Sequence, residues 1–177
     1  MLIEFRFKNY RSFRDEAVLS MEAVGLSSFK KSLIEQNKMK LLPGAAIYGK
    51  NGGGKSNVIR AFWLGVQFIR NAQRIQHEKA SMPVVPFLLD DYSANNPTEF
   101  AFDYIADGIK YWYSFEATKE KIIRESLYHA PKGQKALVFS REQQKFNFTE
   151  DKARRKLISE TVAENQLFFS VACTMND

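Results

Sequence analysis

One octapeptide constrains this chain of 177 residues more than any other feature. Residues 49–56 read Gly-Lys-Asn-Gly-Gly-Gly-Lys-Ser and match the pattern Gly-x-x-x-x-Gly-Lys-Ser/Thr in full. A small apolar run at 45–48 precedes them and predicts a strand buried on both faces. Residues 56–75 follow with apolar side chains at helical spacing, with Ile59, Phe62, Val66 and Ile69 on one stripe. The order strand, glycine loop, helix predicts a phosphate-binding loop, or P-loop.

The spacing within this loop has a physical cause. The loop must wrap a phosphate so that successive backbone N–H groups point inward, and glycine reaches the dihedral angles that this requires. The helix that follows directs the positive end of its dipole at the same anion. We expect Lys55 to reach the β- and γ-phosphates as the catalytic cation, and the Ser56 hydroxyl to bind Mg²⁺. The expected nucleotide-binding residues are Gly49, Lys50, Asn51, Gly52, Gly53, Gly54, Lys55 and Ser56.

The rest of the chain mixes strand and helix patterns, so an α/β fold is predicted. Residues 3–7 alternate apolar and charged side chains, as in a half-buried strand. A second short strand is expected at 16–21, and a loop at 25–42. Further strands are predicted at 100–104, 111–115 and 122–129, with a tight turn at Asp107-Gly108 and a second hairpin over 136–149. Thr149 is the expected cap of a helix that runs to Ala163.

Composition narrows the class of protein. Apolar residues make up 45% of the chain and the net charge is +6, which is ordinary for a folded domain and also permits contact with nucleic acid. The basic cluster at 152–156 is more typical of a solvated helix face than of a DNA contact. Cys173 is the single cysteine, so no internal disulfide can form. No run approaches the ~20 apolar residues of a membrane span, and a cytoplasmic location is expected.

Hydrolysis of a nucleotide needs more than a P-loop. Such enzymes place an acidic residue at the end of a second strand, where it helps to hold magnesium and orient water. Asp90 and Asp91 follow an apolar run, as they would in a self-sufficient kinase or GTPase. Pro86 disfavours a central strand there because proline removes a ladder hydrogen bond. A loop carboxylate is therefore the favoured interpretation of Asp90.

Several segments, taken in order, resemble a known family. They are Asn-Tyr-Arg-Ser-Phe at 9–13, the P-loop with Asn57 after it, Pro-Phe-Leu-Leu-Asp at 86–90, Gly-Ile-Lys-Tyr-Trp-Tyr at 108–113, Glu-Ser-Leu-Tyr at 125–128 and Asn-Gln-Leu-Phe-Phe-Ser at 165–170. Together they look like the amino-terminal lobe of ABC-type ATPases of the RecF/SMC/OLD kind. The resemblance is greatest to bacterial AAA-family ATPases annotated with abortive infection (AbiLi-like).

This resemblance implies ATP as the nucleotide and an antiparallel β-subdomain beside the P-loop. It also implies a homodimer that sandwiches two ATP molecules. On the family pattern Asn51 would lie near the γ-phosphate and Asn57 near the α-phosphate. Arg11 would approach the nucleotide, although a solvated turn arginine fits the sequence equally well, and Gln166 would stand where such ATPases place a magnesium-sensing glutamine.

The chain also departs from the family pattern. Members continue into a Leu-Ser-Gly-Gly signature helix and a strand that ends in Asp-Glu, and neither occurs here. The sequence therefore predicts one amino-terminal lobe that lacks its C-terminal half, as a fragment, a split gene or a truncated reading frame. Its expected parts are the first strands, P-loop and helix (1–80), antiparallel hairpins (81–150) and a helical segment (151–177). The apolar run at 167–172 would be a surface that the other half covers.

Three functions remain open at this point. The first is an ATP-binding lobe of a dimeric ABC-type ATPase that acts on DNA or in antiviral defence, with binding but hardly any hydrolysis by the isolated chain. The second is a complete small kinase or GTPase that uses Asp90 or Asp91. The third is a module in which the nucleotide only switches an interaction surface. The predicted partners are a second copy or a complementary C-terminal lobe, with DNA as a further candidate.

Overall fold

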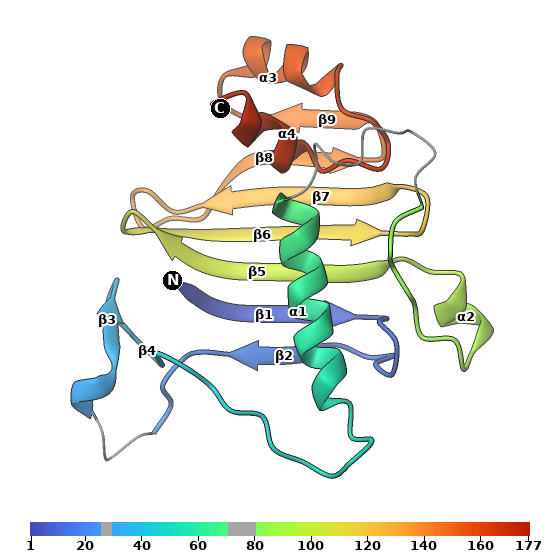
Figure 1. Ribbon diagram of the computed structural model, residues 1–177. Coiled ribbons are helices and arrows are strands. Elements are labelled where there is room, and N and C mark those ends of the chain that lie inside the picture. Colours follow the sequence, from blue (N-terminus) through green and yellow to red (C-terminus); the bar gives the residue numbers. More distant parts are fainter. Residues whose placement is uncertain (26–29, 71–80) are drawn as a thin grey trace.

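A computed structural model describes residues 1–25, 30–70 and 81–177 of the chain. Its main feature is a seven-stranded sheet in the order β2-β1-β5-β6-β7-β8-β9 (Figure 1), in which every neighbouring pair is antiparallel. The strands are β1 (Leu2–Lys8), β2 (Ala17–Ser20), β5 (Thr98–Ala106), β6 (Ile109–Ala117), β7 (Ile122–His129), β8 (Ala136–Glu142) and β9 (Lys145–Phe148). The helices are α1 (Lys55–Arg70), α2 (Asp91–Ala94), α3 (Lys152–Ser159) and α4 (Phe168–Thr174). The predicted mixed α/β class is thus confirmed, and the antiparallel hairpins are present.

Strand alternation and turn residues explain the sheet. Asp107 and Gly108 both have positive φ, 49° and 76°, as the tight turn between β5 and β6 requires. Side chains of β1 and β5 alternate between a buried and a partly exposed face. The segment predicted to be a loop at 25–42 contains a hairpin instead, formed by β3 (Ile34–Gln36) and β4 (Met39–Leu41) after a short 3₁₀ helix, η1 (Lys30–Ser32). Three-residue strands are too short to show periodicity in sequence.

Helix α1 crosses one face of the sheet, and an aromatic core fills the space between them (Figure 1). Phe62, Val66 and Ile69 of the predicted stripe are partly buried against this core, but Ile59 is 57% exposed. The most buried positions of the helix are Ala61, Leu64, Gly65 and Phe68. A Cβ on Gly65 would lie 2.7 Å from the Phe102 ring, so glycine sets the closest approach of helix to sheet. The predicted end of this helix, at residue 75, lies outside the described residues.

The predicted strand at 45–48 is wrong. These residues form no strand and are exposed, with the Tyr48 side chain at 91%. A strand buried on both faces needs neighbours on both edges, and no strand of the described residues pairs with this segment. In Figure 1 the chain runs from β4 past β2 to α1 as an extended connection. The P-loop therefore enters its helix from an irregular, solvated segment.

Two predictions for the C-terminal part are also wrong. Thr149 does not cap α3, because its hydroxyl donates to the carbonyl of Leu137 at 2.5 Å, and Asp151 takes the cap position.

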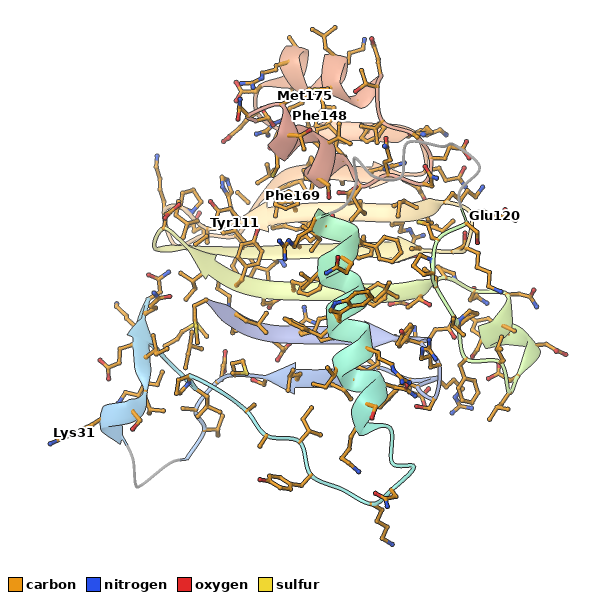
Figure 2. All side chains as sticks on the ribbon, viewed as in Figure 1. Lys31, Tyr111, Glu120, Phe148, Phe169 and Met175 are labelled. Atoms are coloured by element: carbon orange, nitrogen blue, oxygen red, sulfur yellow. The ribbon has the colours of Figure 1, made fainter. Side chains whose placement is uncertain are left out.

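The run at 167–172 is not an uncovered surface. Its Leu167, Phe168, Val171 and Ala172 are buried, and Phe168 contacts three phenylalanine rings, those of 139, 146 and 148. Figure 2 shows the labelled Phe148 in this C-terminal part of the molecule, beside α4. No helix in the described ranges is long and apolar enough to cross a membrane.

Candidate nucleotide-binding site

The glycine-rich loop folds into a cradle at the start of α1. Gly52 and Gly54 have φ of 79° and 86°, in the left-handed region that favours glycine. The Gly53 N–H donates to the Lys50 carbonyl at 3.1 Å, which closes a tight turn. Helix α1 begins at Lys55, where the first N–H groups of any α-helix lack intrahelical partners. The loop therefore leads directly into a helix start, whose backbone N–H groups can bind an anion.

The Lys55 side chain folds back over this loop. Its Nζ donates to the carbonyls of Gly49 at 2.7 Å and Lys50 at 2.8 Å. The ammonium group is thus hydrogen-bonded to the first two residues of the loop. A bound phosphate group would offer this cation a charged acceptor in place of two neutral carbonyls, and charge-assisted hydrogen bonds are about twice as strong.

A cavity of about 360 Å³ lies beside the loop. It is lined by six successive P-loop residues and by three others that the P-loop motif does not include: Asn51, Gly52, Gly53, Gly54, Lys55, Ser56, Asn57, Ser12 and Arg60. Asn57, expected from the family resemblance, is thus grouped with the P-loop. Ser12 and Arg60 were missed, because a turn serine and a helix arginine are ordinary surface residues in sequence.

The turn at 9–13 packs directly against the P-loop. Ser12 Oγ accepts a hydrogen bond from Asn57 Nδ2 at 2.8 Å. A Cβ on Gly54 would lie 2.9 Å from the Phe13 ring, so this ring packs closely against the last glycine of the loop. Arg11 lies in the same turn, but its Nε donates to the Tyr10 hydroxyl at 3.1 Å. The turn therefore supports the loop from behind, and Arg11 is next to the cavity lining without being part of it.

Replacing Gly54 with alanine is expected to disturb this support. The new Cβ would clash with Phe13, and alanine is strained at a φ of 86°. We expect the free energy of unfolding to fall by about 1–3 kcal/mol in urea denaturation. Gly44→Ala is the matched control, because nothing lies within 4 Å of its Cβ and its φ is not positive. Equal stability of the two variants would contradict the packing of the turn on the P-loop.

Asn9 organises the segment that contains Asp90. The Asn9 side chain is buried, donates to the carbonyls of Ser93, Asn96 and Pro97, and accepts from the Phe87 N–H. Sequence gave no signal for this role, because an asparagine before a turn is usually exposed.

Asp90 caps a helix instead of ending a strand. Its Oδ1 accepts from the Ser93 N–H at 2.7 Å at the start of α2, and this bond lowers the pKa of Asp90. Neither Asp90 nor Asp91 lines the P-loop cavity. The geometry favours the interpretation of Asp90 as a loop carboxylate.

Gln166 is held in a separate part of the molecule. Its carbonyl accepts from Arg141 Nη1 at 2.5 Å, and its Oε1 accepts from the Ala163 N–H at 3.1 Å. It does not line the P-loop cavity. Within residues 1–25, 30–70 and 81–177, no group of three or more His, Cys, Asp or Glu side chains could hold a metal ion.

A buried ion pair anchors the segment that contains Gln166. Glu125 and Arg141 both have fully buried side chains, 3.6 Å apart between Oε2 and Nη1. Glu125 accepts from the Tyr113 hydroxyl at 2.9 Å and from the N–H groups of Phe168 and Phe169. Burial raises the pKa of Glu125, although these donors and Arg141 oppose the shift. Charged residues on strands are usually read as exposed, so the sequence did not reveal this pair.

A family of known proteins matches the region that carries this site. Residues 45–170, more than half of the chain, match the family described as "AAA domain, putative AbiEii toxin, Type IV TA system". The chain belongs to this family. No curated protein sequence matches it. AAA domains of this kind are P-loop ATPases, which bind a nucleotide and usually use Mg²⁺.

The residues of this AAA domain fit a nucleotide phosphate with Mg²⁺. The glycine at position 52 has open space where a Cβ would be, so a ligand atom can approach the backbone. Lys55 supplies a cation at the loop, and the Ser56 side chain lines the same cavity. Bound Mg²⁺ would neutralise phosphate charge, and Ser56, which lines this cavity, carries a hydroxyl oxygen of the kind that could hold it.

Proposed function

We propose that the chain is the ATP-binding lobe of an ABC-type ATPase of the RecF/SMC/OLD kind, similar to AbiLi-like abortive-infection ATPases. The observation that carries this function is the Lys55 ammonium folded over a left-handed glycine loop at a helix start. Backbone N–H groups of the loop bind the phosphates, Lys55 contacts the β- and γ-phosphates, and Ser56 holds Mg²⁺. Asn51 and Asn57 contact the outer and inner phosphates.

Exposed apolar side chains near the P-loop support the proposal that a second lobe or a second copy binds there. Tyr48 is 91% exposed, and on α1 Ile59 and Trp63 are 57% and 60% exposed. Ile59 and Trp63 are four residues apart on α1 and so lie on one face of the helix, while Tyr48 directly precedes the P-loop. Exposed apolar side chains gathered near a site mark an interaction surface. We propose that a complementary C-terminal lobe, or a second copy in a homodimer, covers this surface and supplies the acid for hydrolysis. Residues 1–177 then act as one lobe, in the cytoplasm, in DNA-related or antiviral processes.

The rate of nucleotide hydrolysis by the isolated chain distinguishes this function from that of a self-sufficient kinase or GTPase. We expect the isolated chain to bind ATP with Mg²⁺ but to release hardly any phosphate, because Asp90 caps α2 and lies outside the cavity lining. Asp90→Asn keeps the cap, since asparagine also accepts at this position, and should leave ATP affinity unchanged. The measurement is phosphate release under single-turnover conditions, beside calorimetric titration with ATP and with GTP. Rapid hydrolysis that Asp90→Asn abolishes would establish the kinase or GTPase alternative.

A further inference from the structure

The sheet face opposite α1 carries two aromatic rings side by side. Tyr113 of β6 is buried in the core beneath α1, so its neighbour Trp112 points to the opposite face. Trp112 is paired in register with Tyr128 of β7. Directly opposite residues of neighbouring strands have Cβ atoms about 5 Å apart. Their partly exposed rings therefore form one aromatic surface, which we call the Trp112–Tyr128 surface.

Two lysine side chains lie over this surface. Lys110 Nζ lies 4.9 Å from the centroid of the Trp112 ring. Lys135 Nζ lies 4.9 Å from the Trp112 centroid and 4.6 Å from that of Tyr128. Lys135 belongs to the exposed loop between β7 and β8, which also carries Lys132. Two ammonium groups thus lie over the two rings, and a third lysine, Lys132, belongs to the same exposed loop as Lys135.

The adjacent acidic side chains are already paired. Asp103 of β5 lies opposite Trp112 and accepts from Arg6 Nη2 at 2.9 Å. Arg6 also bonds to Glu4. Arg6 and the two lysines over the rings carry three positive charges, and the two acids carry two negative charges, so the net charge around the rings is positive. Further along the strands, the same face carries a cavity of about 550 Å³, whose lining combines lysine, arginine and glutamate side chains with the serines at 114 and 126.

The strengths of cation–π contacts and of base stacking favour a ligand that stacks on the rings. A lysine over an exposed aromatic ring contributes about twofold to fivefold to an equilibrium constant. A nucleic-acid base stacked on the ring contributes about fivefold to about 150-fold. A base can therefore displace the ammonium group, and the freed lysine can then contact a neighbouring phosphate. Bases within a duplex already stack on each other, so only a single strand can make this exchange.

We propose that the Trp112–Tyr128 surface binds single-stranded nucleic acid without sequence preference. Bases stack on the two rings, and phosphates contact Lys110, Lys132 and Lys135. This surface would be the place where DNA, predicted above as a candidate partner, contacts the chain. None of these residues lines the P-loop cavity, so the interaction does not depend on ATP.

The test exploits the two tryptophans of the chain, Trp63 and Trp112. In the Trp63→Phe variant, Trp112 is the single tryptophan, and its fluorescence is followed while oligothymidylate of about 12 nucleotides is added without ATP. We expect quenching on binding, with affinity that falls as salt rises. Trp112→Ala should weaken binding at least tenfold in fluorescence anisotropy with labelled oligonucleotide, whereas Trp112→Phe should retain it within about threefold, since phenylalanine still stacks.

Charge variants complete the test. The double variant Lys110→Glu/Lys135→Glu should weaken binding and make the affinity less dependent on salt. The control Lys31→Glu/Lys152→Glu makes the same charge change at exposed positions elsewhere. It should reduce the salt dependence less and leave the fluorescence quenching in place. Circular dichroism confirms the fold of each variant. Equal affinity for duplex DNA, equal binding of poly-glutamate at the same residues, or unchanged binding by Trp112→Ala would each overturn the assignment. Because ATP is absent throughout, failure here leaves nucleotide binding at the P-loop unaffected.

Discussion

Replacing Lys55 with alanine is expected to weaken binding of ATP with Mg²⁺ by about 2 kcal/mol, or about 30-fold in Kd. The lysine supplies the cation of the loop, and hydrogen bonds to charged groups contribute more than neutral ones. The two carbonyls that it contacts belong to exposed residues, Gly49 and Lys50, so we expect water to bond to them after its removal. The fold should therefore survive the change, and the loss should appear in affinity. Isothermal titration calorimetry with ATP and Mg²⁺ measures it.

Lys31→Ala is the matched control for this variant. Lys31 is an exposed lysine of η1, outside the cavity lining, and its loss also lowers the net charge by one. Its ATP affinity should equal that of the wild type. If Lys55→Ala bound ATP as tightly as Lys31→Ala, the role given to the lysine would be wrong.

Replacing Arg141 with leucine is expected to have the largest effect on stability. The variant leaves Glu125 buried without its cationic partner, and breaking a buried ion pair costs about 3–5 kcal/mol. It also removes donors to the carbonyls of Gln143 and Gln166. Because domains of this size are stable by only about 5–15 kcal/mol, much of the chain should unfold at moderate urea concentrations. Urea denaturation followed by circular dichroism measures the change.

The neighbouring strand offers a control with the same residue type. Arg124 pairs with Glu116 and Glu142, but its side chain is 62% exposed. Exposed pairs contribute only about 0–1 kcal/mol, so Arg124→Leu should change stability little. The double variant Glu125→Leu/Arg141→Leu should recover part of the loss, because no charge is then left buried. Similar losses for Arg141→Leu and Arg124→Leu would show that the buried pair does not anchor the C-terminal segment.

Local patterns in the sequence predicted the features that depend on neighbouring residues. The P-loop motif predicted the left-handed glycines and the start of α1 near Lys55, since both depend on the order of eight consecutive residues. Alternation and the Asp107-Gly108 turn predicted the β5–β6 hairpin for the same reason. The mixed α/β class followed from these elements together.

Features that depend on distant residues were not predictable from one sequence. The apolar run at 45–48 has strand composition, but whether it pairs depends on other strands. The contact of Phe13 with Gly54 joins segments about 40 residues apart, and nothing local marks it. Arg141 lies within the hairpin predicted over 136–149, and the alternation of that hairpin did not mark it as buried. In the structure β8 extends through Glu142, and the Arg141 side chain is buried beside Glu125. The same limit applied to Ser12 in the candidate site.

Hydrogen exchange of the backbone amides, compared with and without ATP and Mg²⁺, tests the central claim most directly. If the glycine loop holds the phosphates, exchange should slow at residues 49–57 and in the packed turn at 9–13, with little change in β7 to β9. Unchanged exchange in the loop at saturating ATP, or protection confined to another part of the chain, would contradict nucleotide binding at this site.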